Sequence, residues 1–512
     1  MADNTRTISS WFFKNTGWLQ SLASIVIGAT IALGQAPYSL IWLSFPAICV
    51  AAYLGVGIVL PRRAAIQGFL VGIGFSVVTF NWIVEPFLVD IKTHGWLAPF
   101  ALILMSAGIG AFWSGAFWAT AKMASAGSFA RVLAVPIFWT GAEMLRSYVL
   151  TGFPWGLTSY IWIDTPVYQI ASVLGPHGMT LATVMLASLL VMSLKRSAYG
   201  QFVVGVFILL MAWAGGAVML GQDASQADYQ GPLVRLIQPN ASQEQKWDPE
   251  MMPIFYNRQL MLTAQESETP IELVIWPEVA VPYLLSDPNS PLWEISGAAN
   301  DVPVIIGAQR FVDGQAFNSL ALLGPKGAVL QVYDKQHLVP FGEYLPGDAL
   351  LNRLGLRALA AQFGTGYSAG SGPNILNVAG LGNFLPLICY EAIFPHELRQ
   401  VDQRPDWMLM ITNDAWFGNF VGPFQHLAQA RARAIETGLP MVRAANTGVS
   451  AVIDARGRVT GSLPLGVAGH LDVRLPETLK ATLYWRLGDK LALIMLFVLA
   501  LITIVVRRNK SN

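Results

Sequence analysis

The sequence predicts a membrane protein in two dissimilar parts, a polytopic bundle of transmembrane α-helices and a water-soluble α/β domain. Of its 512 residues, 54% are hydrophobic and only 12% are charged, which is unusual for a soluble protein. The charges are unevenly spread, because residues 17–220 carry few of them whereas residues 222–487 have the composition of an ordinary globular domain. Long apolar runs lie in the first region and again near the C-terminal end.

The apolar runs define the membrane part. Each is close to the length of about 17 to 25 residues that crosses a bilayer as an α-helix. They lie at residues 17–35, 38–60, 64–84, 96–121, 131–150, 168–193, 200–220 and 488–506. We therefore expect about eight spans, about seven in an N-terminal membrane domain (1–221) and one in a C-terminal segment with a short tail (488–512). The soluble domain (222–487) lies between them.

Lysine and arginine in the connecting loops predict the orientation. They precede the first run and then occur in every second loop, at Arg6, Lys14, Arg62, Arg63, Lys122, Arg131, Lys195, Arg196, Arg507, Arg508 and Lys510. The loops around residues 85–94 and 151–165 are poor in both residue types. Because basic loops stay in the cytoplasm, both termini should be cytoplasmic and residues 222–487 should lie outside it.

Two features of the membrane part are open to structural or functional interpretation. Glu143 and Arg146 stand three residues apart on one helix face, as either a structural ion pair or a ligand contact would. The aromatic loop 151–156 suits an interfacial anchor or the border of a lipid entry path.

The soluble part alternates short apolar stretches with helical ones. Strands are expected at residues 233–237, 272–276, 304–308, 319–323, 329–333, 384–388, 407–411, 441–443 and 449–453, and helices at 249–265 and 425–437. This alternation predicts a layered α/β or α+β domain.

Composition argues against several functions. A net charge of +1, with no basic run interleaved with aromatics, gives no reason to expect a nucleic-acid partner. The two cysteines cannot form a disulfide framework, and Cys49 lies inside an apolar run where it serves packing. Neither metal-ligand spacing nor a glycine-rich phosphate loop occurs, so we expect no metal and no cofactor.

Three stretches of the soluble part bring reactive side chains to strand ends. Glu278 follows a strand that ends at Pro277, Lys335 opens a loop after another strand, and Cys389 follows the apolar strand 384–388. Taken alone, each suits an ordinary turn, and a lone cysteine is usually a packing residue. Together they supply a carboxylate, an ammonium and a thiol just beyond strands of one domain, where α/β folds place their chemistry.

This set of side chains suits nucleophilic catalysis. A thiol is a weak nucleophile until a base such as a carboxylate takes its proton. A nearby lysine favours the thiolate and can stabilise the oxyanion of a tetrahedral intermediate. Spacing alone also leaves a histidine base open, at His337 or His396.

Segments 275–278, 334–343 and 388–391 resemble the three signature segments of the nitrilase (carbon–nitrogen hydrolase) superfamily. With the expected spans around them, almost the whole chain is similar to the bacterial apolipoprotein N-acyltransferases of that superfamily, which catalyse the last step of lipoprotein maturation. Further similar segments are 151–155, 246–248, 413–418, 425–426 and 431–433. Only the stretch between residues 343 and 389 matches loosely.

The resemblance implies an α-β-β-α sandwich and a ping-pong acyl transfer that needs no cofactor. Glu278 would act as general base, Cys389 as the nucleophile that forms a thioester, and Lys335 as the cation that stabilises the oxyanion. The supporting residues would be Glu343 beside the lysine, Tyr390 and Glu391 beside the nucleophile, Asn318 in the site, and Trp247 and Trp416 on substrate-binding loops.

The same resemblance implies the substrates and the cellular location. The acyl chain would leave the sn-1 position of a phospholipid, typically phosphatidylethanolamine. It would pass to the α-amino group of the S-diacylglyceryl cysteine at the N-terminus of an apolipoprotein. The catalytic domain would then lie on the periplasmic side of the bacterial inner membrane, among membrane lipids.

Two other functions use the same residues differently. A membrane-anchored amidase or nitrilase that acts on a soluble amide shares all three signature segments, and only the membrane architecture argues against it. A lipoprotein-binding or transport protein with a degenerate domain would need no catalysis, which the presence of all three reactive residues disfavours.

Overall fold

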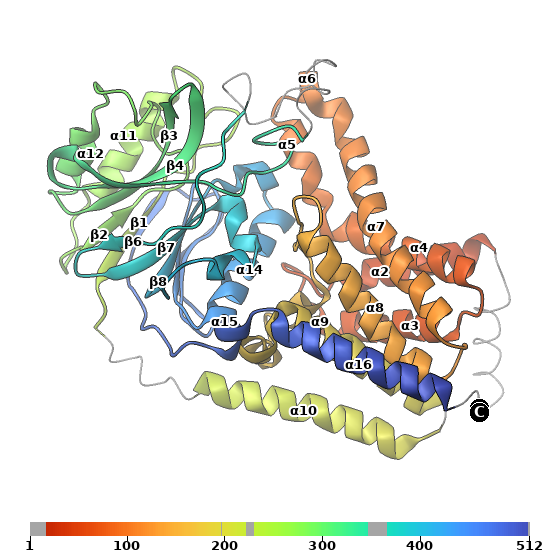
Figure 1. Ribbon diagram of the computed structural model, residues 1–512. Coiled ribbons are helices and arrows are strands. Elements are labelled where there is room, and N and C mark those ends of the chain that lie inside the picture. Colours follow the sequence, from red (N-terminus) through yellow and green to blue (C-terminus); the bar gives the residue numbers. More distant parts are fainter. Residues whose placement is uncertain (1–16, 196, 222–229, 347–365, 510–512) are drawn as a thin grey trace. The chain divides into compact units, whose positions relative to one another are not determined.

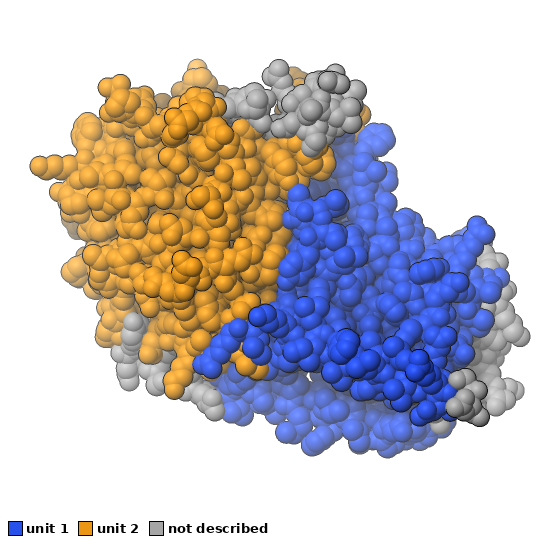
Figure 2. All heavy atoms as spheres, in the orientation of Figure 1, with its two compact units in different colours: residues 1–84, 97–221, 486–512 blue, residues 85–96, 222–485 orange. Residues whose placement is uncertain are grey.

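The computed structural model describes residues 17–195, 197–221, 230–346 and 366–509, and their helices and strands are drawn in Figure 1. The chain divides into two units, coloured separately in Figure 2. The first comprises residues 1–84, 97–221 and 486–512, and the second residues 85–96 and 222–485. Residues 85–96, which we expected within the membrane domain, therefore belong to the second unit.

The first unit consists of helices. Its α-helices are α2 (Trp18–Ala32), α3 (Ile41–Gly57), α4 (Pro61–Thr79), α7 (Ala98–Met123), α8 (Phe129–Tyr148), α9 (Ala171–Lys195), α10 (Tyr199–Gly221) and α16 (Lys490–Arg508). The shorter 3-10 helices are η1 (Asn81–Val84), η3 (Thr158–Trp162) and η4 (Pro166–Ile170), and η2 (Gly95–Leu97) precedes α7. A helix stands at each of the eight ranges expected to span the membrane.

Only some of these helices are long and apolar enough to cross a bilayer. Among the described residues, four segments qualify, at residues 91–123, 166–194, 199–221 and 490–508. A fifth is obtained if α4 and the segment 81–88, bent by 66° at their junction, form one broken span. Helices α2 and α3 have 15 and 17 residues, and α8 contains three charged side chains. The expected number of eight spans is thus not confirmed and stays a prediction.

Glycines let the helices of the first unit approach closely. A Cβ atom added at Gly74 of α4 would lie 1.9 Å from the carbonyl oxygen of Ile25 in α2. One added at Gly72 would lie 2.7 Å from the Cα of Gly110 in α7. Small residues at such crossings are typical of helices that pack in membranes, where close backbone contact replaces the hydrophobic effect.

Charged residues of α8 find polar partners inside the first unit. Glu143 accepts hydrogen bonds from the Thr158 hydroxyl (2.5 Å) and the Thr180 hydroxyl (2.9 Å). Arg146 donates to the carbonyl oxygens of Phe153 and Trp155, each at 2.7 Å. Both residues thus secure the aromatic loop 151–156 and the segment after it, which favours the structural interpretation.

The second unit contains two sheets of six strands each. The first has the order β12-β1-β2-β3-β4-β5 and the second β11-β10-β9-β8-β7-β6. The strands are β1 (Leu233–Gln238), β2 (Leu273–Ile275), β3 (Val304–Val312), β4 (Gln315–Leu323), β5 (Val329–Asp334), β6 (Leu376–Val378), β7 (Gly382–Ile388), β8 (Trp407–Thr412), β9 (Met441–Ala445), β10 (Ser450–Ile453), β11 (Val459–Leu463) and β12 (Gly469–Arg474). Strands β1, β2 and β3 are mutually parallel, as are β7, β8 and β9.

The second unit also contains helices. They are α5 (Glu85–Leu88), α6 (Ile91–His94), α11 (Met252–Thr263), α12 (Leu292–Ala298), α14 (Val421–Thr437) and α15 (Leu483–Leu487), the last of which runs into the first unit; the 3-10 helices are η6 (Pro325–Gly327), η8 (Cys389–Ile393), η9 (Glu397–Arg399) and η10 (Asp414–Phe417). Of these, α11, α12 and α14 pack against the sheets.

Two hydrophobic cores show how these helices pack. Tyr256 of α11 and Ile295 of α12 pack with side chains of β2, β3 and β4. Ala430 and Ala434 of α14 pack with side chains of β7, β8, β9 and β10. With strands of the two sheets in contact between these cores, the layers are helix, sheet, sheet and helix (Figure 1). The expected α-β-β-α sandwich is confirmed.

Candidate active site

Each of the three predicted catalytic residues follows the carboxyl end of a strand. Glu278 comes shortly after β2, Lys335 directly after β5, and Cys389 directly after β7. Strand β5 is antiparallel to β4, which is antiparallel to β3, so β5 runs in the same direction as β2. Because carboxyl ends of parallel strands meet at one edge of a sheet, Glu278 and Lys335 come together there.

Lys335 lies between two carboxylates. Its Nζ donates to Oε1 of Glu343 at 2.9 Å and lies 3.6 Å from Oε1 of Glu278. The side-chain amide of Asn318, on β4, donates to the same two carboxylates, at 2.7 Å to Glu278 and 3.1 Å to Glu343. All four side chains are buried. The structure therefore brings together two catalytic and two supporting residues that the sequence predicted.

The backbone of Glu278 is packed against β3. A Cβ atom at Gly307 would lie 2.6 Å from the Cα of Glu278, so only glycine leaves room there. On its other side, Oε2 of Glu278 accepts a hydrogen bond from the main-chain N–H of Asn413 at 2.8 Å. The carboxylate is thus held by Asn318 of β4, by Lys335 after β5 and by Asn413 after β8.

Cys389 begins η8 with a left-handed backbone, at φ 53°. A non-glycine residue in this region costs roughly 1–3 kcal/mol and persists only where its surroundings enforce it, often at functional sites. The side chain is buried, and the burial raises the pKa of the thiol well above its ordinary value. The charge of Glu278 raises it further, whereas Lys335 and a hydrogen bond with Thr412 lower it.

The pKa of Lys335 is shifted in favour of the charged form. Burial alone would lower it, but the carboxylates of Glu343 and Glu278 outweigh burial and hold it above its ordinary value. The site therefore holds an ammonium beside a protonated thiol, with a carboxylate available to take the thiol proton. This arrangement can generate a thiolate at the moment of reaction.

Glu391 organises the loop around the nucleophile. Its Oε2 accepts from the main-chain N–H of Ile388 at 2.6 Å, and its Oε1 accepts from the Tyr333 hydroxyl and the Gln336 N–H, both at 2.8 Å. Burial raises the pKa of Glu391 to about 7, although these hydrogen bonds lower it. Tyr390 is buried beside it. Glu391 thus connects the strand end that carries Cys389 with the one that carries Lys335.

A histidine base, which spacing left open, is less well placed than Glu278. Nδ1 of His337 lies 2.7 Å from Oε1 of Glu397, and its ring stacks on Phe394 at a centroid distance of 3.8 Å. Nε2 of His396 lies 3.9 Å from the same oxygen of Glu397. Both rings are therefore directed to Glu397.

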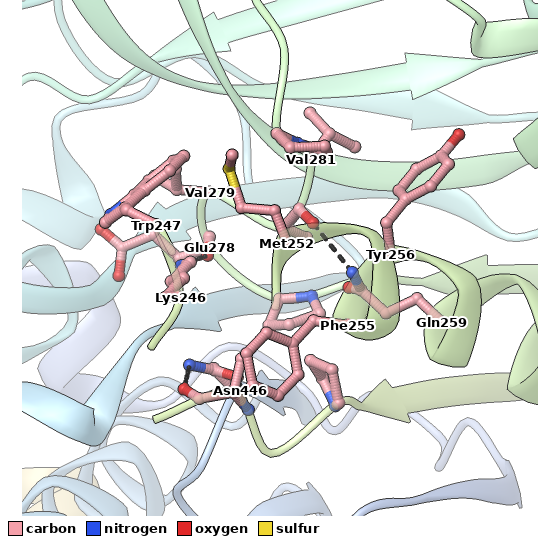
Figure 3. Close-up of a pocket in the computed structure, with 15 residues that line it drawn as sticks. Lys246, Trp247, Met252, Phe255, Tyr256, Gln259, Glu278, Val279, Val281 and Asn446 are labelled. Atoms are coloured by element: carbon pink, nitrogen blue, oxygen red, sulfur yellow. Dashed lines mark hydrogen bonds between the residues drawn. The ribbon is translucent and has the colours of Figure 1, made fainter. Parts of the chain in front are cut away.

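A small pocket adjoins Glu278 (Figure 3). Lys246, Trp247 and Phe255 are among the residues that line it. Nζ of Lys246 donates to the main-chain oxygen of Glu278 at 3.3 Å, and burial lowers the pKa of this lysine to about 8, although the charge of Glu278 opposes the shift. Trp247, predicted to bind substrate, thus lies beside the site, whereas Trp416 is half-buried in η10.

The sequence did not assign roles to several buried residues around Cys389. Thr412 and Asn413 follow β8, Asp414 begins η10, and His426 lies on α14, where its Nε2 contacts the main-chain oxygen of Cys389 at 3.2 Å. The signal that could have found them is the presence of charged residues, including Arg443 on β9, in stretches otherwise rich in buried apolar residues. Among the described residues, no group of three or more His, Cys, Asp or Glu side chains could hold a metal ion.

Comparison with known proteins gives two family matches. The Apolipoprotein N-acyltransferase N-terminal domain matches residues 27–189, and the Carbon-nitrogen hydrolase family matches residues 233–482. A solved carbon–nitrogen hydrolase superfamily protein from Xanthomonas campestris is 22% identical with a TM-score of 0.36, covering 52% of this chain and 93% of its own.

Full-length relatives agree with these matches. An apolipoprotein N-acyltransferase of Bradyrhizobium diazoefficiens is 38% identical over 98% of this chain and 97% of the relative. One of Brucella melitensis is 35% identical over 90% of both chains. The chain therefore belongs to the apolipoprotein N-acyltransferase family, acyltransferases with a carbon–nitrogen hydrolase domain.

Proposed function

We propose that this protein transfers a fatty acyl chain from the sn-1 position of a phospholipid to the α-amino group of an S-diacylglyceryl cysteine at the N-terminus of an apolipoprotein. The observation that carries the proposal is the buried Lys335, which lies between Glu278 and Glu343 and acts electrostatically on the Cys389 thiol. The names of the full-length relatives support the same reaction and disfavour hydrolysis of a soluble amide.

In the first half of the proposed reaction, Glu278 takes the proton of the Cys389 thiol. The thiolate attacks the carbonyl carbon of the ester, and Lys335 stabilises the oxyanion of the tetrahedral intermediate. The bond between that carbon and the glycerol oxygen then breaks. Glu278 returns its proton to the leaving oxygen, which gives a lysophospholipid and a thioester on Cys389.

In the second half, the α-amino group of the acceptor attacks the thioester carbonyl. Glu278 takes a proton from the nitrogen, Lys335 again stabilises the oxyanion, and the carbon–sulfur bond breaks. The products are an amide and a Cys389 thiolate, which recovers its proton from Glu278. A carboxylate fixed by Asn318, Lys335 and the Asn413 N–H suits this double role, because it need not reorient between steps.

The supporting residues have proposed roles that follow from their contacts. Glu343 and Asn318 hold Lys335 and Glu278 in place, and Glu391 with Tyr390 positions the loop of the nucleophile. Trp247 and Trp416 are proposed to bind the lipid chains of the substrates. Large aromatic side chains suit this task because they provide apolar area at little entropic cost.

We also propose that the protein has three parts with a defined orientation in the membrane. A membrane domain at 1–221 and a helix at 488–512 would hold the catalytic domain, 222–487, on the periplasmic side of the inner membrane, with both termini in the cytoplasm. Arg6, Lys14, Arg196 and Lys510, which contribute to this prediction, lie outside the described residues. Phosphatidylethanolamine is the proposed acyl donor.

The purified protein in vesicles tests the proposed reaction. The vesicles contain phosphatidylethanolamine labelled in its sn-1 chain, and a synthetic diacylated lipopeptide is the acceptor. We expect equal amounts of lysophospholipid and triacylated lipopeptide. A lipopeptide with an acetylated α-amino group is the matched control and should accept no label. Release of free fatty acid alone, or of ammonia from a soluble amide, would contradict the proposal.

Removal of the Lys335 ammonium tests the proposed oxyanion contact. We expect Lys335→Ala to lower the rate of acyl-enzyme formation by about 10²- to 10³-fold, the range for loss of one such electrostatic contact. Lys326→Ala, at an exposed position of the same unit, should leave the rate unchanged. A normal thioester yield in the Lys335 variant would refute its role. Both rates are measured by mass spectrometry of quenched reactions.

A further inference from the structure

The main-chain carbonyl of Cys389 has a hydrogen-bond partner from another element. Nε2 of His426, on α14, lies 3.2 Å from this oxygen. A carbonyl oxygen can only accept, so Nε2 carries the hydrogen in this contact. Both residues are buried, and His426 is fully inaccessible to solvent. The hydrogen bond therefore holds the peptide group between Cys389 and Tyr390, which directly follows the left-handed Cα of Cys389.

A buried carboxylate sets the orientation of the His426 ring. Oδ1 of Asp414 lies 3.0 Å from Nδ1 of His426, on the opposite side of the ring from Cys389. The guanidinium of Arg443 adds a positive charge, and its Nη2 lies 2.5 Å from Oδ2 of Asp414 and 3.4 Å from Nδ1 of His426. The ring of Phe417 meets the imidazole edge-on at 5.3 Å. The imidazole is thus held by contacts at both nitrogens and by the ring of Phe417.

Asp414 is itself fixed in this position. The Thr412 hydroxyl donates to its Oδ1 at 2.9 Å, and Thr412 also acts on the Cys389 thiol. Arg443 and His426 outweigh burial and hold the pKa of Asp414 below its ordinary value, so it stays anionic. A Cβ atom at Gly448 would lie 2.2 Å from Oδ2 of Asp414, so glycine leaves the space that this carboxylate fills.

We propose that His426, oriented by Asp414, is a positioning residue that fixes the backbone of Cys389 and thereby directs the thiol toward Glu278 and Lys335. The left-handed conformation needs an external constraint, and the hydrogen bond to the carbonyl oxygen provides one that does not touch the reacting sulfur. Without it the peptide after Cys389 can rotate, and the sulfur moves with its Cα. This inference rests on the proposed function, because it takes Cys389 as the nucleophile.

Two substitutions of His426 separate this bond from the other contacts of the ring. The amide nitrogen of glutamine can reach the position of Nε2, so His426→Gln keeps a donor to Cys389. The amide of asparagine reaches only the position of Nδ1, so His426→Asn keeps a polar contact with Asp414 and loses the bond to Cys389. Both variants bury one neutral amide, which makes them a matched pair.

The test measures single-turnover acylation of Cys389 in the full-length protein, with vesicles of defined phosphatidylethanolamine and detection by mass spectrometry. We expect His426→Asn to acylate about 10- to 100-fold more slowly than the unchanged protein, the cost of a misplacement near 1 Å. His426→Gln should stay within about 3-fold. The phospholipid concentration at half-maximal rate should be the same in all three proteins, because the proposed defect is in the reacting geometry.

Other outcomes would contradict either the positioning role of His426 or the proposed function, and the two cases can be told apart. Equal rates for the two variants, or a faster asparagine variant, would refute the positioning role. Rates that merely follow the thermal unfolding midpoints of the variants would show that His426 only stabilises the fold. If the unchanged protein turns over without a thioester on Cys389, the proposed function fails instead, whatever the variants do.

Discussion

At the residue scale, the pKa shifts of Cys389 and Lys335 have a common cause. Burial and the Glu278 carboxylate both raise the pKa of the thiol, and the carboxylates of Glu343 and Glu278 raise that of the ammonium. Loss of the thiol proton to solvent would place another negative charge in a buried site. Transfer of that proton to Glu278 leaves the net charge of the site unchanged, which is the electrostatic reason for a carboxylate base here.

The two lysines around Glu278 should differ in their titration. Burial lowers the pKa of Lys246 to about 8, whereas Glu343 and Glu278 hold that of Lys335 above its ordinary value. Only a neutral amine reacts with an acylating reagent. Labelling of Lys246 should therefore rise as pH increases through about 8, and Lys335 should remain unlabelled at pH 10. Peptide mass spectrometry across a pH series measures both.

The charge of Glu278 supplies the control for this experiment. It raises the pKa of Lys246, so Glu278→Gln should move the labelling midpoint to lower pH. A midpoint that stays near the ordinary lysine value in both proteins would contradict the assigned environment of Lys246.

At the element scale, the interior strands were predictable and three edge strands were not. Residues of β1, β7 and β8 are nearly all buried, so their apolar runs stand out in the sequence. The missed strands β6, β11 and β12 each form an edge of a sheet. An edge strand faces solvent along one side and needs fewer apolar residues, so its pattern resembles that of a loop.

The catalytic residues of the active site were predictable from the sequence, whereas the contact of His426 with the nucleophile was not. Glu278, Lys335 and Cys389 could be found because each follows an apolar strand. The contact of His426 with Cys389 depends on how α14 packs against the second sheet, and it joins a side chain to a main-chain oxygen. No pattern within a short stretch of sequence predicts such a contact.

Gly448 tests the packing of the elements around Asp414. We expect Gly448→Ala to lower the free energy of unfolding by about 1–3 kcal/mol, because the added methyl group overlaps a buried carboxylate that Arg443 and Thr412 hold in place. Thermal unfolding of the purified protein measures the change.

Gly297 provides the matched control. It lies in α12 of the same unit, and nothing stands within 4 Å of an added Cβ atom. Gly297→Ala should therefore be neutral or stabilise by roughly 0.5–1 kcal/mol. Equal effects of the two substitutions would show that the space beside Asp414 is not filled as described.

At the scale of the whole molecule, the segment 85–96 connects the topology with the catalytic unit. It lies between two expected spans and groups with residues 222–485. Its helix α5 packs against η10, where a Cβ atom at Gly418 would lie 2.6 Å from the side chain of Glu85. Segments that pack together lie on one side of the membrane, and the basic loops predict a common side for residues 85–94 and residues 222–487.

Labelling of single cysteines from outside the cell tests this orientation. Asp313→Cys lies on the exposed β3–β4 connection of the second unit, and Ser125→Cys on an exposed connection between α7 and α8. In a protein without Cys49 and Cys389, a membrane-impermeant maleimide should label position 313 in intact cells with a permeable outer membrane. Position 125 should react only after lysis. The reverse pattern would contradict the predicted topology.

The central claim is that Cys389 carries the acyl chain between the two substrates. The most direct measurement is the mass of the Cys389 peptide after the protein meets a phospholipid with one defined sn-1 chain and no acceptor. We predict that the peptide gains the mass of that acyl group and loses it on addition of a diacylated lipopeptide, whose amine gains it. Full turnover with an unmodified Cys389, or full activity of Cys389→Ser, would contradict the account.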